Sequence, residues 1–313
     1  MSKKTIIKLV LGVIVTVVIV YYSVVSLGSI DIENIFNSNT NWGLATLSVV
    51  IFMYANYIRG LAYTHGIDPD MDQMTAFRIV GIGHAANMVL PLHAGEGLRI
   101  AFFSSDYSIM RRTKLLLIPA AADFVAIMVI SLLSVPFSGF KDPNLLKALW
   151  FLLFLCVAVA VVLVVVIYLV PRLRRYAKEY MNFATVKMMF WVMLSWILLL
   201  ISTWIGLVAF GFHVLVSMKM ALAVFATTNI INFIPASPGS IGLFEYGTVL
   251  ALGGLSVNHT QALAAGWLLH IIQYAALLPM GIVLYITALH GKYGDTLKSM
   301  WRKNRQKNNI SEK

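Results

Sequence analysis

The sequence predicts an all-α integral membrane protein with about six full transmembrane helices and two re-entrant, broken-helix hairpins of opposite orientation. Apolar residues make up 59% of the 313 positions and charged residues only 12%, with a mean hydropathy of +0.82. A soluble domain carries about twice that charged fraction. Two apolar stretches are interrupted by Gly and Pro near their middles. We therefore expect one transmembrane domain over residues 1–290, followed by a basic cytoplasmic tail over 291–313.

Six apolar runs are long enough to span a membrane, since a helix needs about 20 residues to cross the hydrocarbon. They cover residues 6–27, 42–62, 115–135, 146–170, 186–211 and 260–289. The first has Lys3 and Lys4 before it and Lys8 near its start, and could be a signal peptide, but its length favours an uncleaved anchor. Arg59, near the end of the second run, is predicted to extend toward the cytoplasmic interface.

The net charge of +11 is interpreted as a topology signal, because basic residues cluster beside the apolar runs. The clusters lie at Lys3–Lys8, Arg111–Lys114, Arg172–Lys178 and Lys298–Lys307. This pattern argues against nucleic-acid binding and suits anionic lipid headgroups. The single cysteine, Cys156, lies inside an apolar run, so neither a disulfide framework nor a metal site is indicated. No cofactor is expected.

Orientation follows from placing these clusters inside the cell. All four are cytoplasmic only if each broken stretch, about 71–110 and about 217–257, makes an even number of passes. Each stretch should therefore be a hairpin, the first entering from the cytoplasm and the second from the exterior. Both termini are then cytoplasmic, and the protein is assigned to the plasma membrane.

The two broken stretches share an order of residue types: Asn, Pro, a turn of small residues, then Glu. The first contributes Asn87, Pro91, His93, Gly95, Glu96 and Arg99; the second contributes Asn229, Asn232, Pro235, Ser237, Pro238, Gly239, Ser240 and Glu245. Pro and Gly break helices, and a broken backbone inside a membrane must line a cavity or be buried in protein. Paired interruptions of this kind mark the binding site of inverted-repeat transporters. We predict a pseudo-inverted repeat with a substrate or headgroup cavity between the hairpins.

The charged residues of these stretches allow two interpretations. Glu96 and Glu245 follow the turns, so they cap the next half-helix, line a polar pathway, or do both. Arg99 lies three residues after Glu96 and either pairs with it or binds a phosphate. Asp123, inside the third run, is expected to face the cavity or pair with an arginine. His93 titrates near neutral pH and acts as a ligand, a switch or a hydrogen-bonded polar group.

At these residues the sequence resembles the flippase-like membrane domain of lysylphosphatidylglycerol synthases. The segment Asn87–Arg99 follows its N-x3-P-x3-GE-x2-R signature, and Pro238–Glu245 resembles its PGGxGxxE signature. The chain departs from the family at His93, where relatives often have Arg, and at Ser240, where a second Gly is usual. In bifunctional members a soluble lysyl-transferase domain follows, and we expect that domain to be absent from this stand-alone form.

The resemblance implies a translocase that moves an anionic, aminoacylated or otherwise modified phospholipid, or a lipid-linked molecule, between leaflets. Its partners would be membrane lipids, and a homo-oligomer is left open. One alternative is an intramembrane lipid-modifying enzyme or a component related to phosphatidylglycerol lysyltransferase. Its candidate nucleophiles and bases would be Ser237, Ser240, His93 and His270, although no G-x-S-x-G or H-E-x-x-H pattern accompanies them. A non-transporting membrane scaffold is the other alternative.

Overall fold

The computed structural model describes residues 40–90, 94–103, 107–180, 182–232 and 238–290, and this part of the chain is helical throughout apart from connecting turns. Six of its helices are long and apolar enough to cross a membrane. They are α3 (Trp42–Ala62, extended by the π-helical turn η1, Tyr63–Ile67), α6 (Ile109–Ser138), α7 (Pro143–Leu169), α9 (Phe183–Phe210), α10 (Val214–Ile231) and α12 (His259–His290). The shorter elements are α4 (Gln73–Val89), α5 (Ala94–Arg99), η2 (Ile100–Phe102), α8 (Pro171–Tyr180), η3 (Pro238–Ser240) and α11 (Leu243–Gly253).

Five of the six predicted runs are confirmed as membrane-length helices, namely α3, α6, α7, α9 and α12. The predicted run 6–27 and the tail 291–313 lie outside the described residues. The sixth candidate span is α10, which begins three residues before the stretch 217–257 that the sequence predicted as a hairpin and otherwise lies inside it. At 1.5 Å per residue its 18 residues reach about 27 Å, slightly less than a hydrocarbon core of about 30 Å.

Side-chain caps fix where many of these helices begin. An Asn, Asp or Ser side chain accepts a hydrogen bond from a first-turn N–H at the starts of α3, α4, α6, α7, α9 and α12, the capping residues being Asn41, Asp72, Ser108, Asp142, Asn182 and Asn258. Such caps satisfy N–H groups that would otherwise lack partners. Ser108 explains why α6 begins before the apolar run at 115, since the basic segment at 111–114 lies inside the capped helix.

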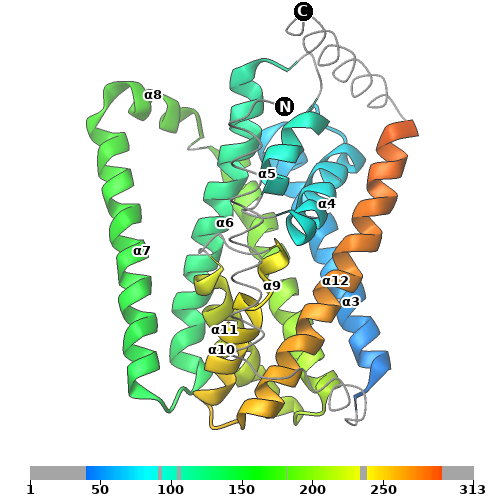
Figure 1. Cartoon of the computed structure of the whole chain (residues 1–313). Coiled ribbons are helices and arrows are strands. Elements are labelled where there is room, and N and C mark those ends of the chain that lie inside the picture. The colour runs from blue at the N-terminus through cyan, green and yellow to red at the C-terminus, as the bar shows by residue number, and fades with distance from the viewer. Residues whose placement is uncertain (1–39, 91–93, 104–106, 181, 233–237, 291–313) are drawn as a thin grey trace, which may run out of the picture.

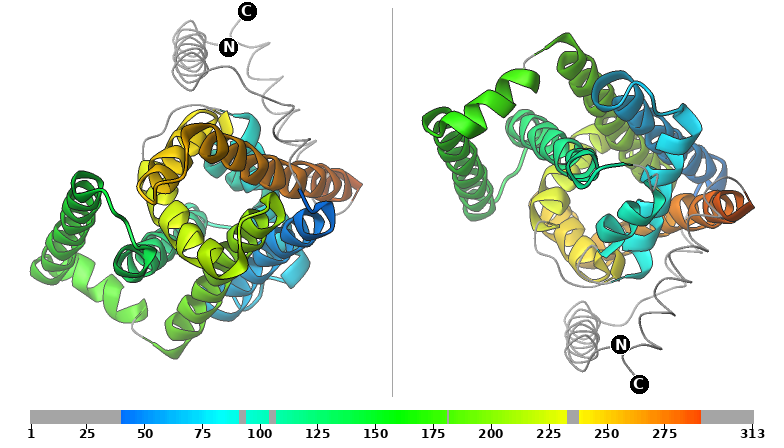
Figure 2. Two further views of the ribbon diagram at one scale, coloured as in Figure 1. Left: turned by 90° about the horizontal axis from the view of Figure 1, so that it is seen from below. Right: turned by 90° about the horizontal axis from the view of Figure 1, so that it is seen from above.

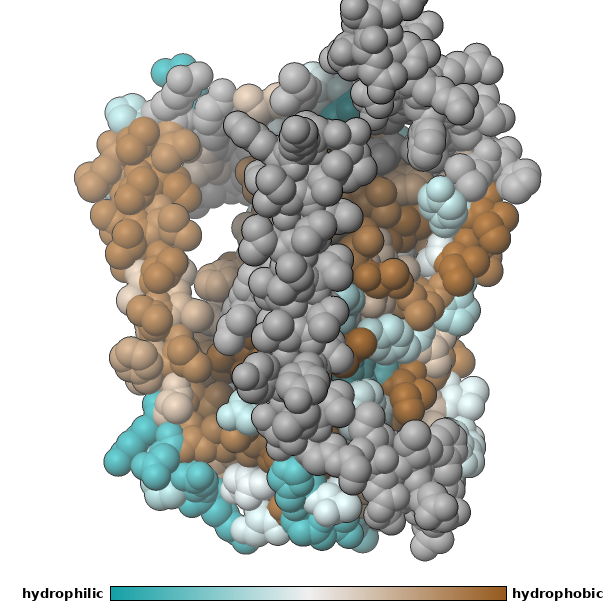
Figure 3. Space-filling view, viewed as in Figure 1, coloured by the Kyte–Doolittle hydropathy of each residue, from teal (hydrophilic) through white to brown (hydrophobic). Residues whose placement is uncertain are grey.

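The two broken segments lie in opposite halves of the bundle. Helices α4 and α5 occupy the upper half of Figure 1, and α10 and α11 occupy the lower half. Seen along the bundle axis, α9, α10, α11, α12 and α4 surround a common centre, with α3 packed outside along α9 (Figure 2). Helix α7 stands to one side and α8 joins it to α9 (Figures 1 and 2). The long apolar surface of α7 is the brown column at the left of Figure 3.

Two kinds of contact hold the central helices together. Ser48 of α3 and Ser202 of α9 exchange hydrogen bonds, each hydroxyl reaching the other residue's backbone oxygen at 2.8–2.9 Å. Helices α4 and α12 instead approach through small residues. A Cβ built on Gly281 would collide with the Cβ of Ala85, and its next contact would be the carbonyl oxygen of Gly81 at 3.5 Å. Close small-residue crossings are a common basis of helix association in membranes.

We predict that Gly281→Ala destabilises the protein by about 1–3 kcal/mol, because the added methyl overpacks a backbone-level contact that cannot adjust cheaply. The measurement is the melting temperature in detergent, followed by size-exclusion chromatography. Gly253→Ala is the matched control, since a Cβ there meets nothing within 4 Å. Equal melting temperatures for the two variants would show that the α4–α12 crossing is not tightly packed.

Candidate functional site

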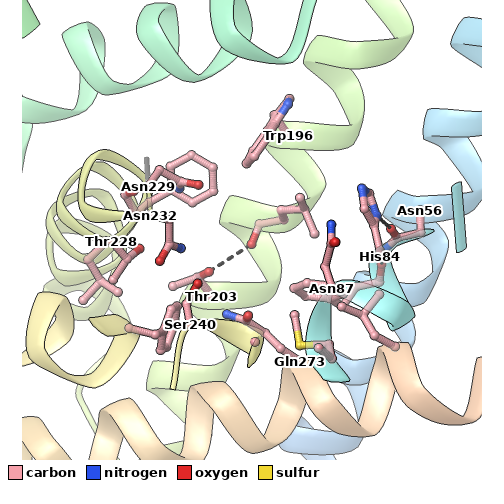
Figure 4. Close-up of a pocket in the computed structure, with 18 of the residues that line it drawn as sticks. Asn56, His84, Asn87, Trp196, Thr203, Thr228, Asn229, Asn232, Ser240 and Gln273 are labelled. Carbon is pink, nitrogen blue, oxygen red and sulfur yellow. Dashed lines mark hydrogen bonds between the residues drawn. The ribbon is translucent and has the colours of Figure 1, made fainter. Parts of the chain in front are cut away.

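A cavity of about 220 Å³ lies inside the bundle, where α3, α4, α9, α10, η3 and α12 converge. Its wall is rich in amide and hydroxyl side chains, several of which point into the same central space in Figure 4. The polar lining residues are Asn56, Arg59, His84, Asn87, Thr203, Thr228, Asn229, Asn232, Ser240 and Gln273. The two broken segments singled out in the sequence thus contribute to a single polar cavity.

The two segments meet directly at one wall of this cavity. The C-terminal end of α4 contacts η3, and the Tyr274 hydroxyl of α12 donates a hydrogen bond to the Met88 carbonyl at 3.2 Å. Gly239 of η3 has a φ of +58°, which favours glycine. A Cβ at this position would also collide with the Tyr274 hydroxyl and lie 3.2 Å from the Met88 oxygen. Only glycine allows so close an approach.

In the first motif, polar side chains bind the short helix α5 to α4. The Asn87 side chain accepts a hydrogen bond from the Gly95 N–H at 2.8 Å and donates one to Glu96 at 3.2 Å. Glu96 then pairs with the buried Arg99 at 2.8 Å. A Cβ on Gly83 would collide with the Arg99 side chain, so Gly83 provides the space that Arg99 fills. The pairing of Glu96 with Arg99 confirms one of the two interpretations of Arg99.

In the second motif, Glu245 holds the start of α11 and fastens it to α12. One carboxylate oxygen accepts the Gly242 N–H at 2.7 Å, and the other contacts His270 Nδ1. His270 Nε2 lies 2.9 Å from the Gly239 carbonyl, which can only accept, so this nitrogen carries a hydrogen. The carboxylate is fully buried. Whether the pair is ionic or neutral, its net charge is zero, as a buried site requires.

The structure separates the predicted site residues into three groups. Asn87, Asn229, Asn232, Gly239 and Ser240 line the cavity. Gly95, Glu96, Arg99, Asp123, Pro238 and Glu245 are described but are not among its lining residues. Pro91, His93, Pro235 and Ser237 lie outside the described residues. Both motif glutamates therefore make structural hydrogen bonds, and the amides and small residues near them form the wall.

Arg59 is the residue that sequence reasoning misplaced. The expectation that it extends toward the interface is wrong, because its side chain turns inward and is only 9% exposed. It pairs with Asp123 at 3.2 Å, its Nε donates to the Ser195 hydroxyl at 3.3 Å, and its guanidinium lies 4.6 Å from the Trp196 ring centre. Trp196 in turn donates to Asp123 at 2.9 Å. The prediction that Asp123 pairs with an arginine is confirmed.

The electrostatics of the cavity are simple. Among its lining residues only Arg59 carries a permanent charge. Asn56 and His84 form a hydrogen bond of 2.6 Å with each other. By contrast, the Asn232 side-chain oxygen is buried without a hydrogen-bond partner in the described part of the chain. Buried polar groups are nearly always satisfied, so this oxygen marks a position in the cavity wall where a hydrogen-bond acceptor is left unused by the described residues.

Comparison with known protein families identifies one match. The family described as Lysylphosphatidylglycerol synthase TM region matches residues 9–281. The chain belongs to this family. No curated protein and no solved structure matches it significantly. Membership in the synthase TM family indicates a role related to lipid modification or translocation. The matched region includes every residue named above as lining the cavity.

We predict that Glu245→Ala destabilises this synthase-family domain by about 3 kcal/mol or more, because it leaves His270 and the Gly242 N–H buried without their partner. Glu245→Gln should cost less, since its amide oxygen can still accept from Gly242. Asp70→Ala is the control, because that carboxylate is 89% exposed and 3.7 Å from Arg111. Melting temperatures in detergent test the expected order of stability, with Asp70→Ala highest, Glu245→Gln lower and Glu245→Ala lowest. A Glu245→Ala variant as stable as Asp70→Ala would contradict the structural role assigned to Glu245.

Proposed function

We propose that this protein is a lipid translocase in which the central cavity carries a polar or anionic headgroup between leaflets while the acyl chains stay in the bilayer. The observation that supports this best is the polar cavity at the junction of the two broken segments. Moving a headgroup through hydrocarbon is costly because its hydrogen bonds to water are lost. A wall of amides and hydroxyls replaces those bonds, and Arg59 offers a positive charge to a phosphate or carboxylate.

The proposal includes a membrane topology. Helices α4 and α5 form a re-entrant hairpin from the cytoplasmic face, and α10 and α11 form one from the exterior, related as a pseudo-inverted repeat. Both termini are cytoplasmic. Three features support this arrangement: α5 and α11 have only 6 and 11 residues, α4 meets η3 at the cavity, and α10 is barely of spanning length. Half-helices that meet beside a substrate site are typical of inverted-repeat transporters.

This topology predicts which positions face each side of the membrane. In a Cys156→Ala background, cysteines at Leu215 and Ser256 should react with an impermeant maleimide from the exterior only. Cysteines at Met74 and Arg175 should react from the cytoplasm only. Labelling in right-side-out and inverted vesicles gives the comparison. If Leu215 and Ser256 label from opposite sides, the α10–α11 segment crosses the membrane and the hairpin topology is wrong.

The proposal assigns no chemical step to the cavity. A serine nucleophile would need a free base, yet His270 is held through both ring nitrogens, by Glu245 and by the Gly239 carbonyl. Ser240 lines the cavity, and no hydrogen bond joins its hydroxyl to His270. These contacts leave His270 without a free nitrogen to act as the base for Ser240. The other candidates, Ser237 and His93, lie outside the described residues.

We expect Gln273→Leu and Asn232→Leu each to slow translocation about tenfold or more, because each removes a polar group from the cavity wall. The assay uses proteoliposomes with headgroup-labelled phosphatidylglycerol, lysyl-phosphatidylglycerol and polyprenyl phosphate, and follows leaflet accessibility with an impermeant quencher. Gln261→Leu is the matched control, since Gln261 lies on the same helix with its side chain exposed.

Three outcomes are informative in that assay. Slow transport in the two cavity variants, with wild-type melting temperatures and a normal Gln261→Leu rate, supports the proposal. Wild-type rates in both cavity variants would place the pathway elsewhere in the molecule. No movement of any of the three lipids by well-folded wild-type protein would overturn the translocase function itself.

A further inference from the structure

A second, purely apolar crevice lies on the outside of the bundle, between α6 and α7. Leu149 and Leu153 of α7 pack into a core against Met128 and Val135 of α6. After Leu153, toward the C-terminal end of α7, a crevice separates the two helices. This crevice has a volume of about 350 Å³ and is lined by Phe124, Val125, Met128, Val129, Leu132, Val157, Ala160, Val161, Val164 and Val165. Of the 18 residues in the most apolar part of α7, only 6% are buried within the protein.

The open end of this crevice is basic. A second hollow of about 540 Å³ begins at Val164, which lines both spaces, and extends over Ile167, Tyr168, Arg174, Ala177 and Lys178. Helix α8, which carries the last three of these residues, has four basic residues and one acidic residue in its sequence. The Arg174 guanidinium lies 5.3 Å from the centre of the Tyr168 ring, so an aromatic side chain holds it beside the opening.

We propose that this continuous surface binds an anionic phospholipid, with an acyl chain in the α6–α7 crevice and the phosphate on Arg174 and Lys178. The apolar crevice suits the acyl chain of such a lipid, and the two basic side chains at its open end suit the phosphate. Basic side chains at a membrane surface attract anionic headgroups, and each adds to the preference. This site is separate from the central cavity, so the inference goes beyond the proposed function and does not depend on it.

A lipid fits the observations better than a protein partner does. The crevice ends at the contact that Leu149 and Leu153 make with α6, and a flexible acyl chain can fill a space of about 350 Å³, whereas a helix is about 10–12 Å wide. A symmetric second copy would bring two α8 helices of the same positive charge together, which is unfavourable. The hollow is visible in Figure 3 beside the upper half of α7.

The test measures lipid preference at the crevice. Val161→Cys in a Cys156→Ala background is labelled with bimane and placed in nanodiscs containing brominated phosphatidylglycerol or brominated phosphatidylcholine. We expect phosphatidylglycerol to show an apparent affinity about fivefold higher or more, from its quenching curve. Bimane at Val162, which does not line the crevice, should show no such preference.

Charge-matched variants decide whether α8 causes the preference. The double variant Arg174→Gln, Lys178→Gln should bind the two lipids with about equal apparent affinity, and so should the unmutated protein at high salt. Lys141→Gln with Lys147→Gln removes two exposed charges near the other end of α7 and should leave the preference unchanged. Equal quenching by both lipids in the unmutated α8 background would overturn the proposal. So would the absence of quenching by either lipid, which would show that protein, such as a second copy, fills the crevice.

Discussion

A polypeptide backbone that stops being helical inside hydrocarbon must find hydrogen bonds within the protein. This constraint governs the centre of the molecule. The Asn87 amide accepts the Gly95 N–H at the start of α5, and the Glu245 carboxylate accepts the Gly242 N–H at the start of α11. His270 reaches the Gly239 carbonyl and Tyr274 reaches the Met88 carbonyl. Each broken segment is thus stabilised by side chains, and α12 supplies two of them.

In each motif, the glutamate makes structural contacts and residues near it line the cavity. The carboxylates of the two motifs are occupied by Arg99 and by His270, and neither lines the cavity. With the backbone secured in this way, the adjacent amides and hydroxyls can remain at the cavity wall. Arg59 brings a guanidinium to the cavity wall, Asp123 balances its charge, and the Trp196 ring lies against it. A rigid polar surface with limited charge suits a headgroup that must bind and also leave.

Much of this architecture could be predicted from the sequence because apolar run length and residue pattern are local properties. Five membrane-length helices follow from such signals. The pairing of Glu96 with Arg99 and that of Asp123 with an arginine were each one of two alternatives that the sequence allowed. The inward turn of Arg59 could not be predicted, since it depends on Asp123, Ser195 and Trp196, which are distant in the sequence. The role of Glu245 likewise depends on His270, one helix away. Helix α8 is short and polar, so hydropathy gave no sign of it.

Under the proposed function, a lipid headgroup enters the cavity beside Arg59. The most direct measurement is photo-cross-linking from a benzophenone amino acid placed at Thr203, which lines the cavity, in proteoliposomes containing headgroup-tritiated lipid. We expect the cross-linked fragment, identified by mass spectrometry, to retain the headgroup label, and excess unlabelled lipid to compete with the reaction. Cross-links confined to acyl chains, or none from Thr203 while an exposed position on α7 reacts freely, would contradict entry of the headgroup into the cavity.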